Sequence, residues 1–344
     1  MYTPFTHNLY VSETFVLCRF NLLLRYIYKQ TKYTCKFCIH ECKIKHLELL
    51  CIHLKSRMMT CILNAKRSDR LTASVYVVGN FKGGVGKTKT VTMLSYISAV
   101  RKNRKTLVID LDPQANATSV LAKTGDIQEV KTSITNGVVS GNLEPEIIHV
   151  IKNLDLIASN VQFRNFGKIL MKLFPDNEVA QISYLSKLIE PLKSKYDAIY
   201  LDVPPTISDY SDNAMMAANH CIVILQTHEL SMDGTKTYIN YMQYLIDTYK
   251  TSLDIIGILP CMLQPRARVD KKVMNNAKEL YGDNVLTTIV GYQERLKAYD
   301  AEGIAMGHMY NGAPDHWDKI AHDLYEDVLN ELDEHEKLLG GERE

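Results

Sequence analysis

Residues 75–90 read VYVVGNFKGGVGKTKT, and this stretch decides the fold. Val75 to Val78 is a short run of β-branched and aromatic residues, the composition of a buried strand. Three glycines follow within four positions, and Lys87 and Thr88 then open a helical pattern. Glycines let successive backbone N–H groups converge on one point, and a helix N-terminus adds a positive dipole there. The stretch therefore predicts a phosphate-binding loop between a strand and a helix, with Lys87 reaching the β- and γ-phosphates and the Thr88 hydroxyl on Mg²⁺.

The chain has 344 residues, enough for two domains or for one α/β domain of about 250 residues with an extension. Its formal net charge of +1 conceals an uneven distribution. Residues 1–70 contain twelve basic residues (Lys or Arg) and four acidic ones, whereas the remainder contains 28 basic and 35 acidic residues. Bulk charge therefore does not predict nucleic-acid binding by the main part of the chain, and any contact with DNA must come from a local basic patch.

The first 70 residues have an unusual composition. Six of the eight cysteines lie before residue 62, and residues 1–64 lack glycine, alanine and aspartate, although turns of folded domains usually need such residues. One interpretation is a zinc site, because cysteines and histidines cluster here. The other is a leader that is disordered or not part of the native protein, with translation starting at Met58 or Met59. The second half of the candidate ligand set lacks regular spacing, which favours the leader. The candidate zinc ligands are Cys35, Cys38, His40, Cys42, His46, Cys51 and His53.

Two further strand patterns end in carboxylates. The run TLVI at residues 106–109 closes a β-loop-α-β unit, which implies a parallel sheet, and Asp110 and Asp112 come directly after it. The carboxyl ends of parallel strands meet at the ligand crevice of such a sheet, so these carboxylates point toward the phosphate loop. A later apolar run at residues 198–201 ends in Asp202, and a carboxylate in that position holds the Mg²⁺ shell in NTPases.

The remaining patterns are structural. Residues 119–153 carry helical stretches, residues 153–158 a short strand, and residues 163–173 and 180–192 amphipathic helices. Apolar runs at residues 220–225 and 254–259 add two buried strands, which a helix over residues 233–249 joins.

The glycine loop departs from the ordinary pattern G-x-x-x-x-G-K-[ST], which would place glycine where this chain has Phe81. It has instead a second lysine, Lys82, directly before the glycine pair. The resulting form KGGVGKT resembles the deviant Walker A loop of the ParA/MinD family of ATPases. The segments DLDPQANAT (residues 110–118) and PPT (residues 204–206) resemble the switch regions of the same family. The resemblance covers roughly residues 72–335.

This resemblance implies an α/β fold with a doubly wound, mostly parallel sheet flanked by helices, a P-loop NTPase of the deviant Walker A type. It implies ATP and Mg²⁺ as cofactors, and three catalytic residues. Lys87 contacts the phosphates, Lys82 crosses a dimer interface to the phosphates of the other subunit, and Asp112 positions the attacking water. The expected metal-binding residues are Thr88, Asp202 and Asp110, the last supporting either Mg²⁺ or its loop. The expected nucleotide-binding residues are Lys82, Gly83, Gly84, Val85, Gly86, Lys87, Thr88 and Lys89.

The family resemblance also implies a cycle on DNA. Two subunits sandwich two ATP molecules, the homodimer binds DNA without sequence preference, and slow hydrolysis, accelerated by a centromere-binding ParB-like adaptor, releases it. The implied role is plasmid or chromosome segregation, in the cytoplasm and at the nucleoid. Residues 287–292 correspond to the segment that closes over adenine in the family. Basic residues follow the late strands where the family binds DNA, and the expected DNA contacts are Arg266, Arg268 and Arg295.

Three other functions remain open. A MinD-like membrane-positioning ATPase needs a basic lipid-binding tail, but residues 317–339 form an acidic amphipathic pattern that anionic lipid repels, so we expect no membrane partner. An electron carrier like the nitrogenase reductase needs cysteines that bridge a cluster, whereas Cys221 and Cys261 lie in strand patterns. The third is a metal-dependent nucleic-acid-binding module in the leader. The expected division is a leader at residues 1–70, an ATPase domain at 71–337 and a flexible tail at 338–344.

Overall fold

The computed structural model describes residues 72–226, 229–263, 268–305, 309–310 and 313–341. By its internal contacts the chain divides into two units, Met1–Asp69 and Arg70–Glu344, and all described residues lie in the second. The candidate zinc ligands of the leader, and the predicted DNA contact Arg266, lie outside the described residues.

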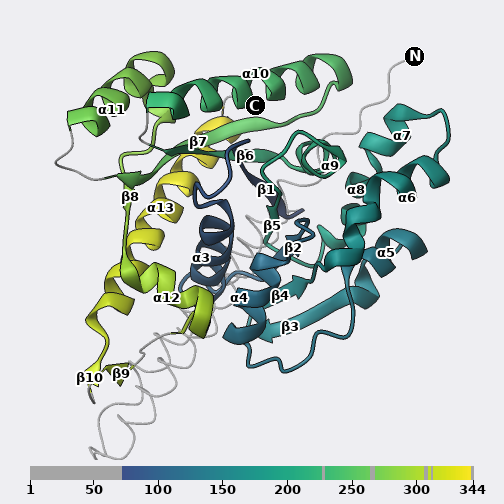
Figure 1. Cartoon of the computed structure of the whole chain (residues 1–344), viewed down its shortest axis with the longest axis horizontal. Coiled ribbons are helices and arrows are strands. Elements are labelled where there is room, and N and C mark those ends of the chain that lie inside the picture. Colours follow the sequence, from purple (N-terminus) through teal and green to yellow (C-terminus); the bar gives the residue numbers. More distant parts are fainter. Residues whose placement is uncertain (1–71, 227–228, 264–267, 306–308, 311–312, 342–344) are drawn as a thin grey trace, which may run out of the picture. The chain divides into compact units, whose positions relative to one another are not determined.

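Within the described residues, one eight-stranded sheet organises the second unit (Figure 1). Its strands are β1 (Ser74–Gly79), β2 (Thr106–Asp110), β3 (Ile147–Ile151), β4 (Leu154–Ile157), β5 (Ala198–Asp202), β6 (His220–Gln226), β7 (Asp254–Leu263) and β8 (Val290–Gly291). The strand order is β3-β4-β2-β5-β1-β6-β7-β8, and neighbours are parallel except that β3 pairs antiparallel with β4 at one edge. This arrangement confirms the predicted mostly parallel α/β sheet.

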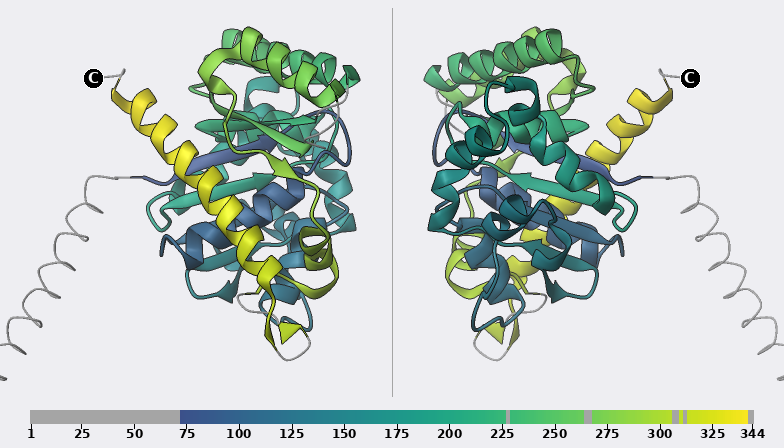
Figure 2. Two further views of the ribbon diagram at one scale, coloured as in Figure 1. Left: turned by 90° about the vertical axis from the view of Figure 1, so that its left-hand side faces the viewer. Right: turned by 90° about the vertical axis from the view of Figure 1, so that its right-hand side faces the viewer.

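Helices cover both faces of this sheet (Figure 1, Figure 2). They are α3 (Lys87–Val100), α4 (Asn116–Thr124), α5 (Ile134–Ser140), α6 (Phe166–Leu173), α7 (Glu178–Ile182), α8 (Tyr184–Ile189), α9 (Asp209–Ala217), α10 (Glu229–Tyr249), α11 (Arg268–Tyr281), α12 (Glu294–Glu302) and α13 (His316–Gly341). The 3₁₀ turns η1 (Glu144–Glu146), η2 (Val161–Asn165), η3 (Glu190–Leu192) and η4 (Gly282–Asn284), and the strand pair β9 (Met309–Tyr310) and β10 (Ala313–Pro314), complete the described elements.

Strand β1 contributes side chains to both hydrophobic cores, because successive residues of a strand point to opposite faces of the sheet. Val75 and Val77 belong to the core under α5 to α11. Tyr76 and Val78 belong to the core under α3, α4, α12 and α13. All four side chains are almost completely buried, which explains why this strand has an unbroken apolar sequence.

The phosphate loop leaves the sheet at its centre. β1 lies between β5 and β6, and β5 lies between β1 and β2, so the carboxyl ends of β1, β2 and β5 are neighbours. In this register Asp202 is paired with Val78 on one side and with Asp110 on the other. Ligands of open α/β sheets bind outside the carboxyl ends of the strands. The fold therefore brings Asp110 and Asp202 side by side, next to the phosphate loop.

The acidic helix α13 docks onto the basic turn that ends α3. Arg101 donates to Asp323 at 2.7 Å and to Glu326 at 2.5 Å. Arg104 makes a bidentate pair with Asp333, at 2.8 and 2.5 Å. We call these five residues the α13 clamp. Figure 2 shows α13 crossing one face of the sheet, where it contacts α3. The acidic side chains of the clamp are therefore engaged within the fold.

Helix α13 also extends beyond residue 337, the predicted end of the ATPase domain. α13 continues to Gly341, so residues 338–341, which were expected to belong to a flexible tail, are helical. None of the helices in the described ranges is long and apolar enough to cross a lipid bilayer.

Candidate functional site

The loop between β1 and α3 depends on two glycines for its conformation. Gly84 (φ 71°) and Gly86 (φ 102°) have left-handed backbones, and beyond their chain neighbours no atom lies within 4 Å of where a Cβ would stand. Backbone conformation, not crowding, therefore requires glycine at both positions. No described side chain caps the first turn of α3, which leaves its N–H groups available to an anion.

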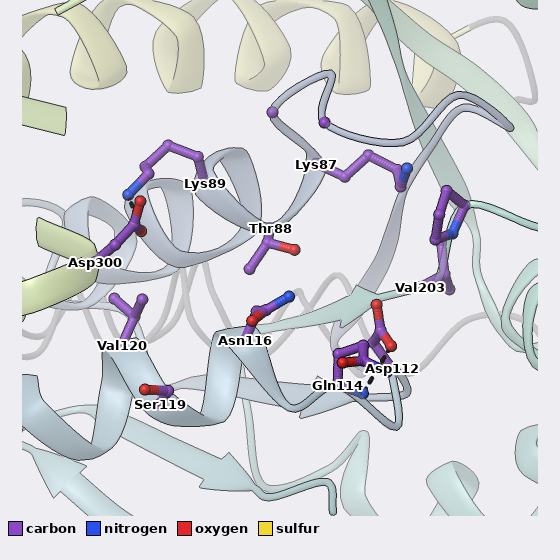
Figure 3. A pocket seen from close by; sticks show the side chains of 13 residues that line it. Lys87, Thr88, Lys89, Asp112, Gln114, Asn116, Ser119, Val120, Val203 and Asp300 are labelled. Atoms are coloured by element: carbon purple, nitrogen blue, oxygen red, sulfur yellow. Dashed lines mark hydrogen bonds and ion pairs between the residues drawn. The ribbon is translucent and has the colours of Figure 1, made fainter. Parts of the chain in front are cut away.

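A cleft of about 620 Å³ opens beside this loop (Figure 3). This volume lies in the range of small-molecule binding sites. The loop and the first turn of α3 form one wall. The others are formed by α4 with the turn before it, by the segment after β5 and by α12. The lining residues from outside the loop and α3 are Asp112, Gln114, Asn116, Ser119, Val120, Val203, Pro205 and Asp300.

Lys87 is the buried cation of the cleft, with 6% of its surface exposed. Its Nζ donates a hydrogen bond to the backbone carbonyl of Lys82 at 3.0 Å. Burial lowers the pKa of the ammonium, while the nearby charges of Asp202 and Asp112 oppose that shift. A cation in a poorly solvated wall beside free backbone N–H groups favours an anionic ligand. The structure thus places Lys87 where the sequence predicts a phosphate contact.

Asp110 uses both of its carboxylate oxygens to hold the turn between β2 and α4. Oδ1 accepts the N–H of Asp112 at 3.0 Å, and Oδ2 accepts the N–H and the hydroxyl of Thr118 at 2.9 and 2.7 Å. Burial raises the pKa of Asp110 to about 6, although these hydrogen bonds oppose the shift. Of the two roles expected for Asp110, Mg²⁺ or its loop, the contacts support the loop.

Asp202 has the opposite environment. It is fully buried, and neither carboxylate oxygen accepts a hydrogen bond of ordinary geometry from the described residues. Burial raises the pKa of Asp202 well above its usual value, and the charge of Asp110 adds to the shift, while the Thr88 hydroxyl and Lys87 oppose it. A buried carboxylate without a partner fits a hard cation. No cluster of three or more His, Cys, Asp or Glu ligands exists among the described residues.

We expect Asp202→Asn to stabilise the protein in the absence of metal and nucleotide. The substitution removes a buried charge without a partner, so the unfolding free energy at pH 7 should rise by about 1 to 3 kcal/mol. Because the folded-state pKa is raised, the gain should disappear below pH about 4, where Asp202 is protonated in both states. Urea denaturation at both pH values measures this.

The same variant should lose the stabilisation that Mg²⁺ with nucleotide gives the parent. The exposed carboxylate Asp283 offers a control, since Asp283→Asn should change neither quantity. A parent and an Asp202→Asn variant with equal Mg²⁺-dependent stabilisation would contradict a metal role for Asp202.

Asp112 faces the cleft from the wall opposite Lys87 (Figure 3). Its Oδ1 accepts the N–H of Gln114 at 2.9 Å, and its carbonyl accepts the N–H of Ala115 at 2.8 Å. Ala115 has a left-handed backbone (φ 55°), so the turn before α4 is tight and holds the Asp112 carboxylate at the edge of the turn. The side chain remains half-buried and open to the cleft. The position suits a group that orients a small ligand near the phosphates.

The two other lysines of the loop region differ from each other. Lys82 is exposed, while Lys89 lines the cleft and forms an ion pair with Asp300 of α12. Lys123 of α4 donates to the carbonyl of Asp300 at 2.6 Å. α12 therefore closes one side of the cleft. This contact could not be predicted from the sequence, because Asp300 lies more than two hundred residues after Lys89.

A second, smaller cavity of about 120 Å³ adjoins the cleft and shares Gly86 and Lys89 with it. Apolar side chains dominate its wall, including Val85, Val290 and Leu296. The segment at residues 287–292, expected to close over adenine, contributes three lining residues. Its mostly apolar lining suits a weakly polar group next to the phosphate loop.

Arg295 was expected to contact DNA, but its environment is not that of a DNA contact. Its guanidinium pairs with Asp318 at 2.5 Å, Glu302 at 3.1 Å and Asp315 at 3.6 Å, and it stacks on the ring of Tyr299 at 5.0 Å. Its side chain is only 12% exposed. Arg295 therefore joins α12 to α13, and its environment argues against a DNA contact. Arg268 is the first residue of α11.

Known proteins match a large part of this chain. The model of the AAA domain family matches residues 73–255. The chain belongs to this family. It is 27% identical over 235 residues to the sporulation initiation inhibitor protein Soj of Bacillus subtilis, covering 67% of this chain and 88% of that protein. It is also 27% identical over 247 residues to the chromosome partitioning protein ParA of Myxococcus xanthus, covering 71% and 84%. The predicted membership of the ParA/MinD superfamily of partition ATPases is confirmed.

Solved structures confirm the fold. A plasmid partition protein from Borrelia burgdorferi superposes with a TM-score of 0.58 at 21% identity, over 75% of this chain and 99% of that one. Cobyrinic acid a,c-diamide synthase from Mycobacterium smegmatis, with bound ADP and magnesium, gives a TM-score of 0.57 at 22% identity, over 67% and 91%. Proteins of different function share this fold, so these two likenesses establish architecture alone.

Proposed function

We propose that this protein is a partition ATPase that dimerises with ATP and Mg²⁺, binds DNA without sequence preference in that state, and leaves DNA after partner-stimulated hydrolysis. The pair of lysines on one loop carries the proposal. Lys87 is buried beside the cleft, whereas Lys82 of the same loop is exposed. Lys87 thus lies where the phosphates of its own cleft would bind, and we infer that the exposed Lys82 reaches the phosphates of a second subunit, as in the family that the loop resembles.

ATP fits the two adjoining cavities. The phosphates would lie along residues 82–89, where the glycine loop, the first turn of α3 and Lys87 favour negative charge. The base would enter the smaller apolar cavity near Val85 and Val290. Proteins with this fold have been solved with ADP and magnesium and with AMPPNP, which supports a nucleotide in this position.

The residues of the cleft also fit Mg²⁺. Thr88 and Asp202 would hold the ion, with nucleotide oxygens and water as its other ligands. The bound ion would neutralise charge on the phosphates as the terminal phosphate leaves. Asp110 would act through its loop, because it fixes the turn that carries Asp112.

Hydrolysis needs a group that orients the attacking water. Asp112 supports this role through its position, since it lies half-buried on the wall facing Lys87 and its carboxylate is held by one backbone N–H. We infer that turnover of the isolated protein is slow and that a centromere-binding ParB-like adaptor accelerates it, as in a partition cycle.

Contact with DNA would use the basic residues outside the Arg295 network. Arg266 and Arg268 remain candidates, and each phosphate neutralised would steepen the salt dependence of binding by about 0.9 log units per log unit of salt. We propose that the protein works in the cytoplasm at the nucleoid, and that residues 71–337 form the core of the ATPase domain.

The deciding experiment is a gel shift with ATP, ADP or no nucleotide, using two duplexes of unrelated sequence. We expect both duplexes to shift with ATP and Mg²⁺ and neither with ADP. An equal shift in all three conditions, or no shift with ATP, would contradict the proposal. Sedimentation with anionic liposomes and ATP tests the MinD-like alternative, which predicts that the protein pellets with the lipid.

Lys82→Ala should separate nucleotide binding from dimerisation. Because Lys82 is exposed and Lys87 is not, we expect ATP affinity to stay within about threefold of the parent and dimerisation to weaken at least about tenfold. Light scattering with AMPPNP and Mg²⁺ measures the dimer. Lys168→Ala, at an exposed lysine of α6, is the control and should dimerise normally. Undiminished dimerisation of Lys82→Ala would remove the second lysine from the mechanism.

A further inference from the structure

We propose that Asn80 and Phe81 are positioning residues for Lys82. They hold the backbone on either side of the Lys82 peptide, so that this exposed side chain faces a second subunit when nucleotide binds. The inference rests on the proposed ATP-dependent dimer. It identifies Asn80 and Phe81 as the part of the loop that determines the affinity of the two subunits for each other but not their affinity for nucleotide.

Asn80 ties the loop to the neighbouring strand. It is 2% exposed and lies directly after β1. Its Nδ2 donates to the carbonyl of Ile224 in β6 at 2.7 Å, and its Oδ1 accepts the backbone N–H of Lys82 at 2.9 Å. Both ends of the amide are therefore used, and they anchor Lys82 to the rigid centre of the sheet.

The carbonyl of Lys82 is held by the other lysine. It accepts a hydrogen bond from the Lys87 ammonium at 3.0 Å. Phosphate competes for that ammonium, because a charge-assisted bond to an anion is stronger than one to a neutral carbonyl. When Lys87 turns to phosphate, the Lys82 carbonyl loses this donor, and Asn80 and Phe81 remain to fix the peptide.

Phe81 is the second anchor. Its ring packs edge-on against the rings of Tyr238 and Tyr241 of α10, with centroid distances of 4.8 and 5.6 Å. Tyr238 can reach this position because residue 79 is glycine: a Cβ there would stand 1.7 Å from the Tyr238 hydroxyl. The aromatic side chain of Phe81, at a position where the ordinary phosphate-loop pattern has glycine, thus fastens the loop to α10.

The aromatic contact also continues to helix α9. Tyr241 donates from its hydroxyl to Asp212 at 2.9 Å. Asp212 belongs to α9, the helix that follows the Pro204–Thr206 segment. The anchor of Phe81 is therefore part of a fixed framework of two helices and not of a mobile surface loop.

A fixed backbone matters more for Lys82 than for Lys87. Lys87 is enclosed by its own fold, whereas Lys82 is exposed, and holding its long side chain against the phosphates of a partner means a loss of conformational entropy. Order in the backbone before association reduces that loss. In a twofold dimer each subunit contributes one Lys82, so a loosened backbone at this residue would weaken two contacts in one association step.

The test compares Asn80→Ala with Asn219→Ala in the full chain. Asn219 is a matched control, because its Oδ1 accepts the N–H of Val75 at 3.0 Å near the opposite end of β1. We expect Asn80→Ala to raise the dimer dissociation constant with AMPPNP at least about tenfold and to change monomer affinity for the analogue by less than about threefold. Asn219→Ala should lower thermal stability without weakening the dimer.

A double-mutant cycle with Lys82→Ala shows whether Asn80 acts through Lys82. In the Lys82→Ala background, Asn80→Ala should have no further effect on the dimer. Phe81→Leu, which keeps an apolar side chain but removes the ring contacts, should repeat the result if Asn80→Ala fails to fold. Equal losses of nucleotide affinity and dimerisation, or an effect that persists without Lys82, would overturn the inference. A parent that stays monomeric with AMPPNP would instead remove the proposed function, and this inference with it.

Discussion

Lys87→Ala is expected to weaken ATP binding by at least about 100-fold, because it removes the buried cation of the cleft and with it one or two charge-assisted bonds to phosphate. The gel shift with ATP should be lost as well, because the ATP-bound dimer would not form. Titration with a fluorescent ATP analogue, followed by the gel shift with ATP, measures both consequences.

Lys105 is the matched control for this variant. It is an exposed lysine directly before β2, at the amino end of the strands and thus at the opposite edge of the sheet from the cleft. Lys105→Ala should bind ATP like the parent. If Lys87→Ala bound ATP within about threefold of the parent, Lys87 would not be a phosphate ligand and the assignment of the cleft would fail.

Asp112→Ala should have the second large effect, and on a different step. We expect ATP binding and dimerisation to persist while hydrolysis falls by about 100- to 10,000-fold, the range that a positioned base contributes. The variant should therefore accumulate as an ATP-bound dimer on DNA. Phosphate release and light scattering in ATP measure the two halves of this result.

Asp112→Asn separates charge from shape. The amide can still accept the N–H of Gln114, so the turn should survive, but it cannot take a proton from water. Asparagine and alanine should then be equally slow. Unchanged turnover in either variant would remove Asp112 from the mechanism.

The central strands could be predicted from the sequence because buried parallel strands are continuous apolar runs. β1, β2 and β5 follow that rule, and the carboxylates that end β2 and β5 lie side by side at the carboxyl edge of the sheet. β3 did not follow it. Residues 119–153 were expected to carry helical stretches, but Ile147–Ile151 is an antiparallel edge strand. Four of its five residues are β-branched and apolar, but His149 interrupts the run and only Val150 is buried.

The site was predictable only where its chemistry is local in sequence. The glycine loop, Asp112 and Asp202 each lie in a short motif. The contacts of Lys89 with Asp300, and of Arg295 with Asp318, join segments whose pairing depends on how α12 and α13 pack. An arginine in a loop pattern therefore suggested DNA, although its carboxylate partners lay farther along the chain.

The α13 clamp complicates any attempt to count DNA phosphates by adding potassium chloride. Electrostatic screening reaches across about 10 Å at 0.1 M salt but only about 3 Å at 1 M, and it weakens guanidinium–carboxylate pairs at the surface as well as protein–phosphate pairs. Loss of binding along such a series would thus mix release from the duplex with loosening of α13 from α3. Melting curves recorded at the same chloride concentrations would tell the two apart.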